Sequence, residues 1–284
     1  MDDKKLTQIL NRGIAQDLVN LDVGQLMDEK ILITGAKGSI GMALVKELET
    51  YKELNFLATD IEDGYEILDI TNEDSVKKTL TKYNPTMVVH LAGAKHAPEG
   101  EIDYWSTFNI NTVGTHNFVK NISPDTKMIL TSTCKSANPE IVYGASKLIA
   151  ERMVLNSGGS VARFFNVIES SGNVFTIWED IELNQPLEVA PICERYFITL
   201  DEALGLLKYT MMNQPGRYIV NKVKLRNMGD IAKDLYPNRQ TIEIMPRRGD
   251  RLTEKFVATS ESVEKLLLGD SIAKVTSIHD YVEV

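Results

Sequence analysis

The sequence predicts an α/β fold in which a doubly wound parallel sheet is followed by a smaller C-terminal lobe. The first observation is that short apolar runs alternate with stretches of helical periodicity as far as about residue 168. Strands that alternate with helices of this length form βαβ units and therefore a parallel sheet. The second observation is a glycine-rich turn between the first strand and its helix, which is typical of Rossmann-type folds.

Three parts are predicted along the 284 residues, a length that suits one large domain with a smaller lobe. Residues 1–28 form an N-terminal lead-in, with a short helix and an extended segment at 18–22. Residues 29–168 form the dinucleotide-binding domain, and residues 169–284 form a substrate lobe that is partly interleaved with the main sheet. The strands and helices of the dinucleotide-binding domain are expected at 31–34, 42–51, 55–60, 74–83, 87–91, 103–121, 127–132, 143–156 and 160–166.

The composition excludes several classes of function. A net charge of −9 argues against a general surface for nucleic acid or anionic membranes. The two cysteines, Cys134 and Cys193, indicate a reducing compartment and no disulfide framework. No apolar run approaches ~18 residues, and the N-terminus lacks the apolar region of a signal peptide. We therefore expect a cytoplasmic protein without a membrane segment, and no pattern predicts a metal site.

The glycine-rich turn predicts a dinucleotide site. Its three glycines follow the buried strand at 31–34 and precede a helix, so backbone N–H groups can approach a pyrophosphate at the helix N-terminus. A merely structural turn is the alternative, but the strand and helix on either side favour the dinucleotide. The residues predicted to bind the cofactor in this turn are Gly35, Lys37, Gly38, Ser39, Ile40 and Gly41.

Asp60 and Lys37 make opposite predictions about the cofactor. Asp60 ends the second strand about 20 residues beyond the glycines, where a carboxylate takes the ribose hydroxyls and would repel a 2′-phosphate. Lys37, inside the glycine turn, could instead pair with that phosphate. We expect NAD, with NADP as the alternative, because the ribose carboxylate is the more direct determinant.

Tyr143 and Lys147 lie four residues apart, which on a helix places both side chains on one face. An ammonium beside a phenol favours the phenolate, so the tyrosine could exchange a proton near neutral pH. Thr133, ten residues upstream, could hold a substrate alcohol against the phenol. This spacing also occurs in ordinary amphipathic helices, and the glycine turn is what favours catalysis here.

Together the two motifs resemble those of extended short-chain dehydrogenases/reductases. The segments Val89-His-Leu-Ala-Gly-Ala-Lys-His-Ala-Pro98, Asn111-Thr-Val-Gly-Thr115 and Arg163-Phe-Phe-Asn-Val167 are similar to the nucleotide-sugar branch. Within it, Ser132-Thr-Cys-Lys-Ser-Ala-Asn-Pro139 and Arg247-Arg-Gly-Asp-Arg-Leu252 resemble motifs of the UDP-N-acetylglucosamine 4,6-dehydratases of capsule and flagellin-glycan synthesis. The short connection after Asp60 looks more like the dTDP-4-dehydrorhamnose reductases.

The resemblance implies the following chemistry. Tyr143 accepts the proton of the sugar 4-hydroxyl while hydride moves to NAD, and Lys135 then removes the acidified hydrogen on carbon 5. Hydride returns to carbon 6 as the 6-hydroxyl leaves, so the cofactor is tightly bound and recycled. An aspartate before the lysine protonates the 6-hydroxyl in the relatives, and Cys134 replaces it here. A thiol is a weak hydrogen-bond donor, so either Cys134 is a poor acid or it only fills space.

The remaining predicted contacts come from loops at the carboxyl edge of the sheet and from the lobe. Arginine suits a diphosphate because its planar fork donates in parallel to phosphate oxygens. The predicted substrate-binding residues are Lys95, His96, Asn166, Arg195 and Arg247. The predicted cofactor contacts beyond the glycine turn are Asp60, Asp69, Ile70, Leu91, Ala92, Gly93, Asn111, Tyr143 and Lys147. For Asp69 a turn-forming role is the alternative.

The expected function is therefore that of a UDP-N-acetylhexosamine 4,6-dehydratase, with or without inversion at carbon 5. A sugar-nucleotide epimerase and a 4-keto reductase are the alternatives, because Cys134 weakens the case for water loss. The retained Thr133, Tyr143 and Lys147 argue against a non-catalytic subunit. A homo-oligomer built from the helices at 103–121 and 143–156 is also expected, by resemblance and because the first helix carries several large apolar residues.

Overall fold

A computed structural model describes residues 1–280 and contains one nine-stranded sheet in the order β13-β14-β10-β6-β5-β4-β1-β2-β3. The strands from β3 to β10 run parallel, whereas β14 and β13 join the far edge antiparallel. The predicted doubly wound parallel sheet is therefore confirmed. The strands are β1 (Lys30–Thr34), β2 (Asn55–Asp60), β3 (Glu66–Ile67), β4 (Met87–His90), β5 (Lys127–Thr133), β6 (Ser160–Phe164), β10 (Arg217–Val220), β13 (Glu261–Leu267) and β14 (Ile272–Ser277).

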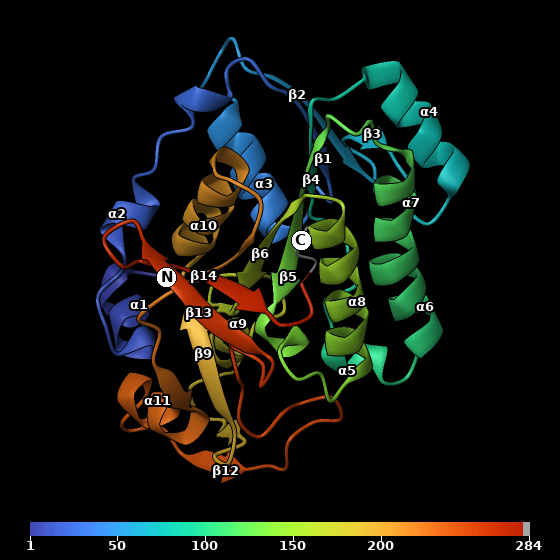
Figure 1. Cartoon of the computed structure of the whole chain (residues 1–284). Helices are drawn as coiled ribbons and strands as arrows, with labels where there is room; N and C mark the ends of the chain where they lie inside the picture. Colours follow the sequence, from blue (N-terminus) through green and yellow to red (C-terminus); the bar gives the residue numbers. More distant parts are fainter. Residues whose placement is uncertain (281–284) are drawn as a thin grey trace.

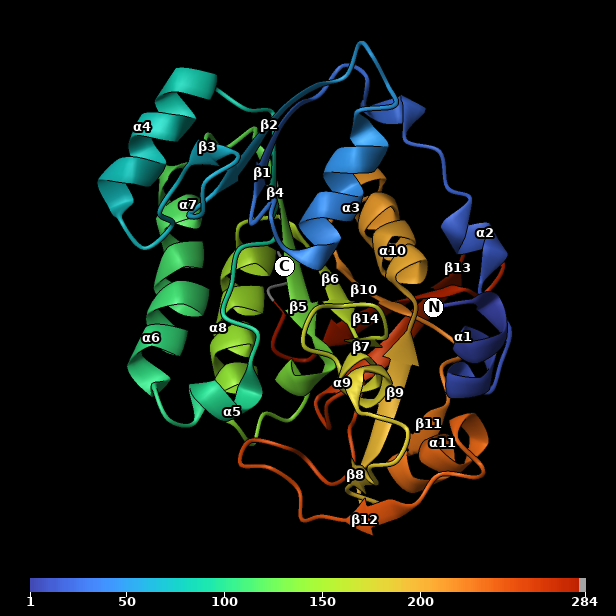
Figure 2. The same cartoon turned by 180° about the vertical axis from the view of Figure 1, so that it is seen from behind.

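Helices cover both faces of this sheet. Figures 1 and 2 show α3 and α10 on one side and α4, α6, α7 and α8 on the other. Alternation along β1 explains the two layers, because Ile31 and Ile33 pack with α3 and α10, whereas Leu32 packs with α4, α7 and α8. The helices are α3 (Ser39–Leu48), α4 (Glu73–Tyr83), α6 (Tyr104–Phe108), α7 (Gly114–Asn121), α8 (Val142–Asn156) and α10 (Leu200–Met212).

Two local features differ from the sequence prediction. The predicted helix at 103–121 contains a π-helical turn, Asn109–Val113, between α6 and α7. Such turns are rare and are often found at functional sites. In the lead-in, the segment predicted to be extended is partly helical, because α2 (Gln16–Val19) and a 3₁₀ turn (Gly24–Leu26) follow α1 (Asp3–Leu10).

A lobe of small sheets and short helices lies beside the carboxyl edge of the main sheet. Its core gathers apolar residues from α1, α9, α11 and the strands between them, including Ile9, Phe175, Trp178, Phe197 and Ile231. The chain leaves this lobe to add β10 and later β14 and β13 to the main sheet. The lobe elements are β7 (Asn166–Val167), α9 (Val174–Asp180), β8 (Leu187–Val189), β9 (Glu194–Ile198), β11 (Leu225–Asn227), α11 (Met228–Leu235) and β12 (Thr241–Glu243).

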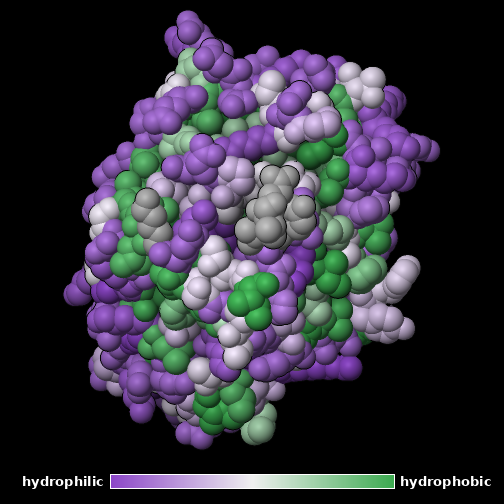
Figure 3. Space-filling model, in the orientation of Figure 1, coloured by the Kyte–Doolittle hydropathy of each residue, from purple (hydrophilic) through white to green (hydrophobic). Residues whose placement is uncertain are grey.

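The face of the molecule in Figure 3 is mostly hydrophilic, with hydrophobic residues in scattered small patches. No helix within residues 1–280 has both the length and the apolar character needed to cross a membrane. Three large apolar side chains are clearly exposed around the start of α6: Ile102 (72%), Tyr104 (64%) and Trp105 (66%).

Candidate active site

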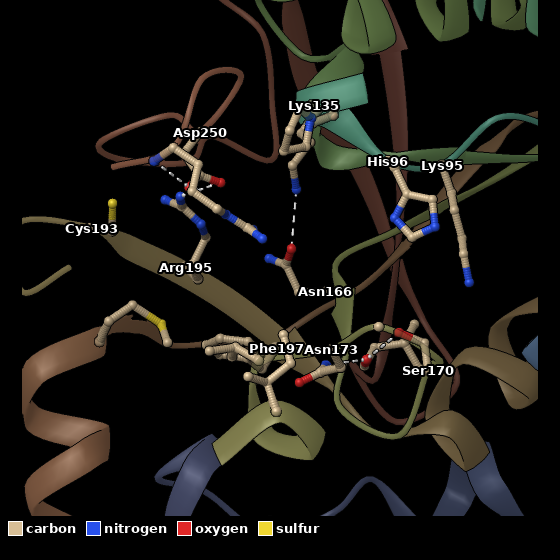
Figure 4. Close-up of a pocket in the computed structure, with 18 of the residues that line it drawn as sticks. Lys95, His96, Lys135, Asn166, Ser170, Asn173, Cys193, Arg195, Phe197 and Asp250 are labelled. Carbon is tan, nitrogen blue, oxygen red and sulfur yellow. Dashed lines mark hydrogen bonds and ion pairs between the residues drawn. The ribbon is translucent and has the colours of Figure 1, made fainter. Parts of the chain in front are cut away.

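A cavity of about 500 Å³ lies between the carboxyl edge of the parallel strands and the lobe. This edge is where ligands bind in open α/β sheets. Figure 4 shows Lys135 and Asn166 in the middle of the cavity, Lys95 and His96 on one side, and Arg195 and Asp250 on the other. The lining residues predicted from the sequence are Ile40, Lys95, His96, Thr133, Lys135, Tyr143, Asn166, Arg195 and Arg247.

The glycine turn forms a cradle that fits a dinucleotide. Gly35 has a φ of 70°, and a Cβ there would lie 2.5 Å from the backbone nitrogen of Ala92. A Cβ on Gly41 would lie 2.3 Å from the carbonyl oxygen of Gly35. Only glycine permits this close approach of backbone to backbone, and α3 begins at Ser39 with Gly38 as its N-cap. The N-terminus of α3 is therefore available to an anionic group.

Asp60 and Lys37 are both engaged in local contacts. The Asp60 carboxylate accepts hydrogen bonds from the backbone N–H groups of Lys37, at 2.8 Å, and of Ile61. The Lys37 ammonium lies 3.0 Å from a carboxylate oxygen of Glu62. Asp60 thus holds the glycine turn against the end of β2. Binding of a 2′-phosphate by Lys37 would compete with Glu62.

Two predicted adenine-side residues have structural contacts. The Asp69 carboxylate accepts hydrogen bonds from the backbone N–H and the hydroxyl of Thr71, at 2.9 and 2.7 Å, which is the turn-forming alternative. Ile70 is buried against Gly114 of α7. Leu91 and Ala92 pack directly against the glycine turn, so their backbone contributes to its wall.

Asn111 lies in the π-helical turn and is buried between two parts of the site. Its amide donates to the carbonyl of Ala94 at 3.1 Å and to the hydroxyl of Ser146 at 3.0 Å. Its Oδ1 has no hydrogen-bond partner among the described residues and lies close to Gly93, as does the Lys147 ammonium. A buried acceptor without a partner is costly, so a donor from a bound group would satisfy it. Asn111 also braces α8 through Ser146.

Tyr143 and Lys147 lie one turn apart on α8; Lys147 is buried, whereas Tyr143 is half-buried and lines the cavity. Burial raises the pKa of the Tyr143 phenol, although Lys135 and Thr133 oppose this rise. The expectation that Lys147 brings this phenol near neutrality is therefore wrong for the protein without cofactor. Burial also lowers the pKa of Lys147 to about 8. The positive charge that acts most on Tyr143 comes from Lys135, not Lys147.

Cys134 is fully buried in the core beneath the cavity. Burial raises the pKa of its thiol to about 12, with Glu254 adding to the rise and Lys135 opposing it. The effect of Lys135, which lowers this pKa, is thus outweighed. A thiol that holds its proton so tightly is a poor proton donor. These contacts favour the space-filling role over the acid role.

Lys135 faces the cavity and is held by two side chains. Its Nζ donates to Asn166 Oδ1 at 3.0 Å and lies 2.7 Å from Glu254 Oε1. Burial alone would lower the pKa of Lys135, but the Glu254 carboxylate outweighs it and raises this pKa. The sequence prediction missed Glu254, which lies 119 residues downstream. Its position two residues after the Arg247–Leu252 motif was the available signal.

Lys95 and His96 form the opposite side of the cavity with a loop that follows β7. The Lys95 ammonium donates to the hydroxyl of Ser171 at 2.6 Å. The backbone N–H of Ser171 in turn donates to the hydroxyl of Ser39, at 3.1 Å. This loop therefore joins the glycine turn to this wall of the cavity. His96 packs close to Gly172 of the same loop.

The two predicted diphosphate arginines differ in exposure. Arg195 is mostly buried, with its guanidinium 3.6 Å from Asp250 and 3.7 Å from Glu254. The side chain of Arg247 is 63% exposed and pairs with Asp250 at 3.3 Å. Both line the cavity, and both are paired with acidic side chains. Arg251 is buried and donates to the carbonyl of Ala137, which gives it a structural role.

Comparison with known proteins identifies the family. A family model described as polysaccharide biosynthesis protein matches residues 50–275. The chain belongs to this family. A probable polysaccharide biosynthesis protein of Bacillus subtilis, EpsC, is 28% identical over 86% of this chain and 48% of its own length. A Campylobacter jejuni UDP-N-acetylglucosamine 4,6-dehydratase (inverting) is 26% identical over 82% of this chain and 79% of its own length.

The chain spans about half the length of the first curated relatives that it matches. Solved structures share the fold. A Thermus thermophilus UDP-glucose 4-epimerase in complex with NAD has a TM-score of 0.67 at 18% identity, with 81% of this chain and 90% of that chain covered. A Clostridium acetobutylicum dTDP-4-dehydrorhamnose reductase has a TM-score of 0.67 at 23% identity, with 79% and 89% covered. The chain is therefore a member of the polysaccharide biosynthesis protein family, and it shares a Rossmann-type fold with these solved structures.

Proposed function

We propose that this member of the polysaccharide biosynthesis family is a 4,6-dehydratase of a UDP-N-acetylhexosamine. The observation that carries the proposal is that Tyr143 and Lys135 face one cavity, with Thr133 beside the phenol. A reaction confined to carbon 4 needs the tyrosine but has no use for a buried lysine on the cavity wall. Dehydration requires a second proton-transfer group, and we assign this role to Lys135, which would act on the neighbouring carbons 5 and 6.

The bound nicotinamide dinucleotide would accept hydride from the sugar and return it. We propose NAD, tightly held and recycled, because Asp60 ends β2 where the adenosine ribose would lie. Asn111 and Lys147 would hold the second ribose and orient Tyr143. The phenol would take the proton of the 4-hydroxyl while Thr133 holds that oxygen in place. A positively charged ring beside the phenol would lower the pKa that burial raises.

The UDP moiety would be held at the lobe side of the cavity. Arg195 and Arg247 reach the cavity from β9 and from the loop before residue 254; the exposed guanidinium of Arg247 would donate to phosphate oxygens, and Arg195 would have to exchange its contacts with Asp250 and Glu254 to do so. Lys95 and His96 would contact the sugar or the adjacent phosphate from the opposite side.

A second function, 4-epimerisation or 4-keto reduction, is favoured by Cys134. Its thiol is buried beneath the cavity and its pKa is raised to about 12, so the acid of the dehydratase relatives has no equivalent at this position. Tyr143, Thr133 and Lys147 would suffice for chemistry at carbon 4 alone.

A proton NMR time course with UDP-N-acetylglucosamine and no added cofactor tests the proposal. We expect the signals of the hydroxymethyl protons at carbon 6 to disappear and a methyl signal to appear. Inversion of carbon 4 without a methyl signal would favour the epimerase. Absence of any reaction until NADH or NADPH and a 4-keto sugar are supplied would favour the reductase.

A further inference from the structure

Glu254 is a fully buried carboxylate directly behind the cavity wall. Its Oε1 lies 2.7 Å from Lys135 Nζ, and its Oε2 accepts hydrogen bonds from the Asn166 amide at 2.7 Å and the Tyr196 backbone N–H at 3.3 Å. The side chain of Lys135 is 14% exposed, whereas that of Glu254 is 0% exposed. Lys135 thus separates Glu254 from the substrate, and any effect of Glu254 on the reaction must pass through Lys135.

We propose that Lys135 and Glu254 act as one proton-transfer unit that replaces the acid missing at position 134. The inference rests on the proposed dehydration and adds to it a positioning residue, Glu254, which decides where the proton of the pair resides. The short contact lets a single proton move between the ammonium and the carboxylate without solvent.

The charged and titratable groups around the pair explain its resting form. Arg195 lies on the side of β9, with Asp250 beyond it, while Tyr143 approaches from α8 and Cys134 from the end of β5. Burial alone would raise the pKa of Glu254, but Lys135 and Arg195 lower it. The resting pair is therefore an ammonium and a carboxylate.

Substrate that expels water from the cavity favours the neutral form of the pair, because separated charges are costly in a dry site. Proton transfer from Lys135 to Glu254 then leaves a neutral amine facing the sugar. After oxidation at carbon 4, the C5–H bond breaks and its proton moves to Lys135 Nζ. The electron pair left on carbon 5 forms the C5–C6 double bond as the C6–O6 bond breaks.

The proton on Lys135 Nζ moves to O6, which leaves as water. Lys135 is again a neutral amine and Glu254 still carries the resident proton, which returns to Lys135 when the site opens. The pair has gained and lost one proton, so the elimination balances without an acid at position 134. When hydride returns to carbon 6, carbon 5 takes up one proton, which balances the proton that Tyr143 took from the 4-hydroxyl. Water loss and carbon-5 deprotonation occur on the same face of the sugar, because one amine serves both.

The experiment measures the initial rate of dehydration of UDP-N-acetylglucosamine from pH 6 to 9, read as the methyl signal at carbon 6. The variants are Glu254→Gln, Glu254→Asp and, as a matched control, Glu194→Gln. Glu194 is a neighbouring carboxylate that accepts from Thr253 and not from Lys135. The parent, the Asp variant and the control should share one pH profile.

In Glu254→Gln the lysine must lose its proton to solvent before it can act as a base. Below the pKa of Lys135, the neutral fraction of its amine rises about tenfold per pH unit. The ratio of the parent rate to the variant rate should therefore fall about tenfold per pH unit. The contribution of Tyr143 is common to both proteins and cancels in this ratio.

A ratio that stays constant with pH would overturn the proton-transfer unit while leaving the dehydratase proposal intact. Oxidation at carbon 4 without dehydration in the parent would instead overturn the proposed function, and this inference with it. Cys134→Ala tests whether the acid is Cys134 or the Lys135–Glu254 pair. If the pair is the acid, this substitution should lower the dehydration rate by far less than the ~10²–10⁴-fold that loss of an acid–base group causes. A loss in that range would return the acid role to Cys134.

A second readout needs neither substrate nor cofactor. Acylation of Lys135 by acetic anhydride, followed by mass spectrometry, reports how much of the amine is unprotonated. Glu254→Gln should react faster than the parent at pH 8, because the carboxylate that holds the ammonium is gone. Equal reactivity in two folded proteins would show that Glu254 does not control the proton on Lys135.

Discussion

The guanidinium of Arg163 on β6 donates two hydrogen bonds to the carboxylate of Glu151 on α8, from Nε to Oε1 at 3.0 Å and from Nη2 to Oε2 at 2.6 Å. Arg217 donates to the same carboxylate at 2.9 Å. Glu151 follows Tyr143 and Lys147 at four-residue intervals, so all three occupy one face of α8. This buried cluster fixes the helix that carries the proton-transfer residues against the sheet.

We expect Glu151→Gln to lower the free energy of unfolding at pH 7 by about 3 kcal/mol, because it removes the carboxylate that Arg163 and Arg217 share and leaves them paired only with Glu261 and Asp280. Burial alone would raise the pKa of Glu151, but Arg163 and Arg217 lower this pKa to about 2. A depressed carboxyl pKa stabilises the fold above the pKa of the unfolded chain, and this contribution is lost as pH falls from about 4.5 toward 2. Urea unfolding of parent and variant should therefore converge at low pH. A difference that is the same at pH 7 and pH 3 would contradict this account.

The main sheet and its helices could be predicted from the sequence because their signals are local. Apolar runs such as 31–34 mark strands that are buried on both faces, and Gly35 and Gly41 are needed wherever backbone approaches backbone. The lead-in at 18–22 was partly mispredicted, since Leu18 packs in the main core and belongs to α2. The π-helical turn at Asn109–Val113 has no simple sequence signature and depends on the contacts of Asn111.

Tyr143→Phe should leave the fold and the cofactor content unchanged and reduce turnover by at least ~10²–10⁴-fold, because only the proton acceptor is removed. The measurement combines turnover of UDP-N-acetylglucosamine with the absorbance of the cofactor in the purified protein. Comparable turnover in parent and variant would refute the assignment of Tyr143. Loss of the cofactor as well would assign the hydroxyl to binding.

Lys147→Met should raise the stability at pH 7 by on the order of 3 kcal/mol, because a buried ammonium opposes folding. Burial lowers the pKa of Lys147 to about 8, from an ordinary value of 10.5. The unfolded chain therefore binds the proton more tightly, and the destabilisation is complete below pH 8 and fades as pH rises toward 10.5. Thermal unfolding at pH 7 and pH 10 should show a gain that shrinks at the higher pH. A destabilised variant at pH 7 would contradict the prediction.

We predict an interface between copies of this chain at the exposed apolar side chains of Ile102, Tyr104 and Trp105. They are exposed together at the start of α6, and Ile149 of α8 is also 43% exposed. Exposed apolar surface of this kind is typical of an association site. Light scattering at micromolar concentration should give at least a dimer for the parent and a smaller species for Trp105→Glu. A monomeric parent would count against an oligomer built from these helices.

The site was less predictable than the fold, because burial and distant partners decide its chemistry. The spacing of Tyr143 and Lys147 places both on one face of α8, but it cannot show that burial raises the pKa of the phenol. Position 134 shows only a cysteine, whereas the structure shows that the thiol lies in the core. The partner of Lys135 is Glu254, 119 residues away, and only the folded chain brings the two together.

The most direct test of the central claim follows the hydrogen of carbon 4 through the reaction. UDP-N-acetylglucosamine carrying deuterium at carbon 4 is incubated with the protein, and the product is examined by NMR and mass spectrometry. A 4,6-dehydratase with a recycled cofactor should deliver this deuterium to the carbon-6 methyl group, with no net consumption of cofactor. Deuterium that returns to carbon 4, or that leaves with a released cofactor, would contradict the account.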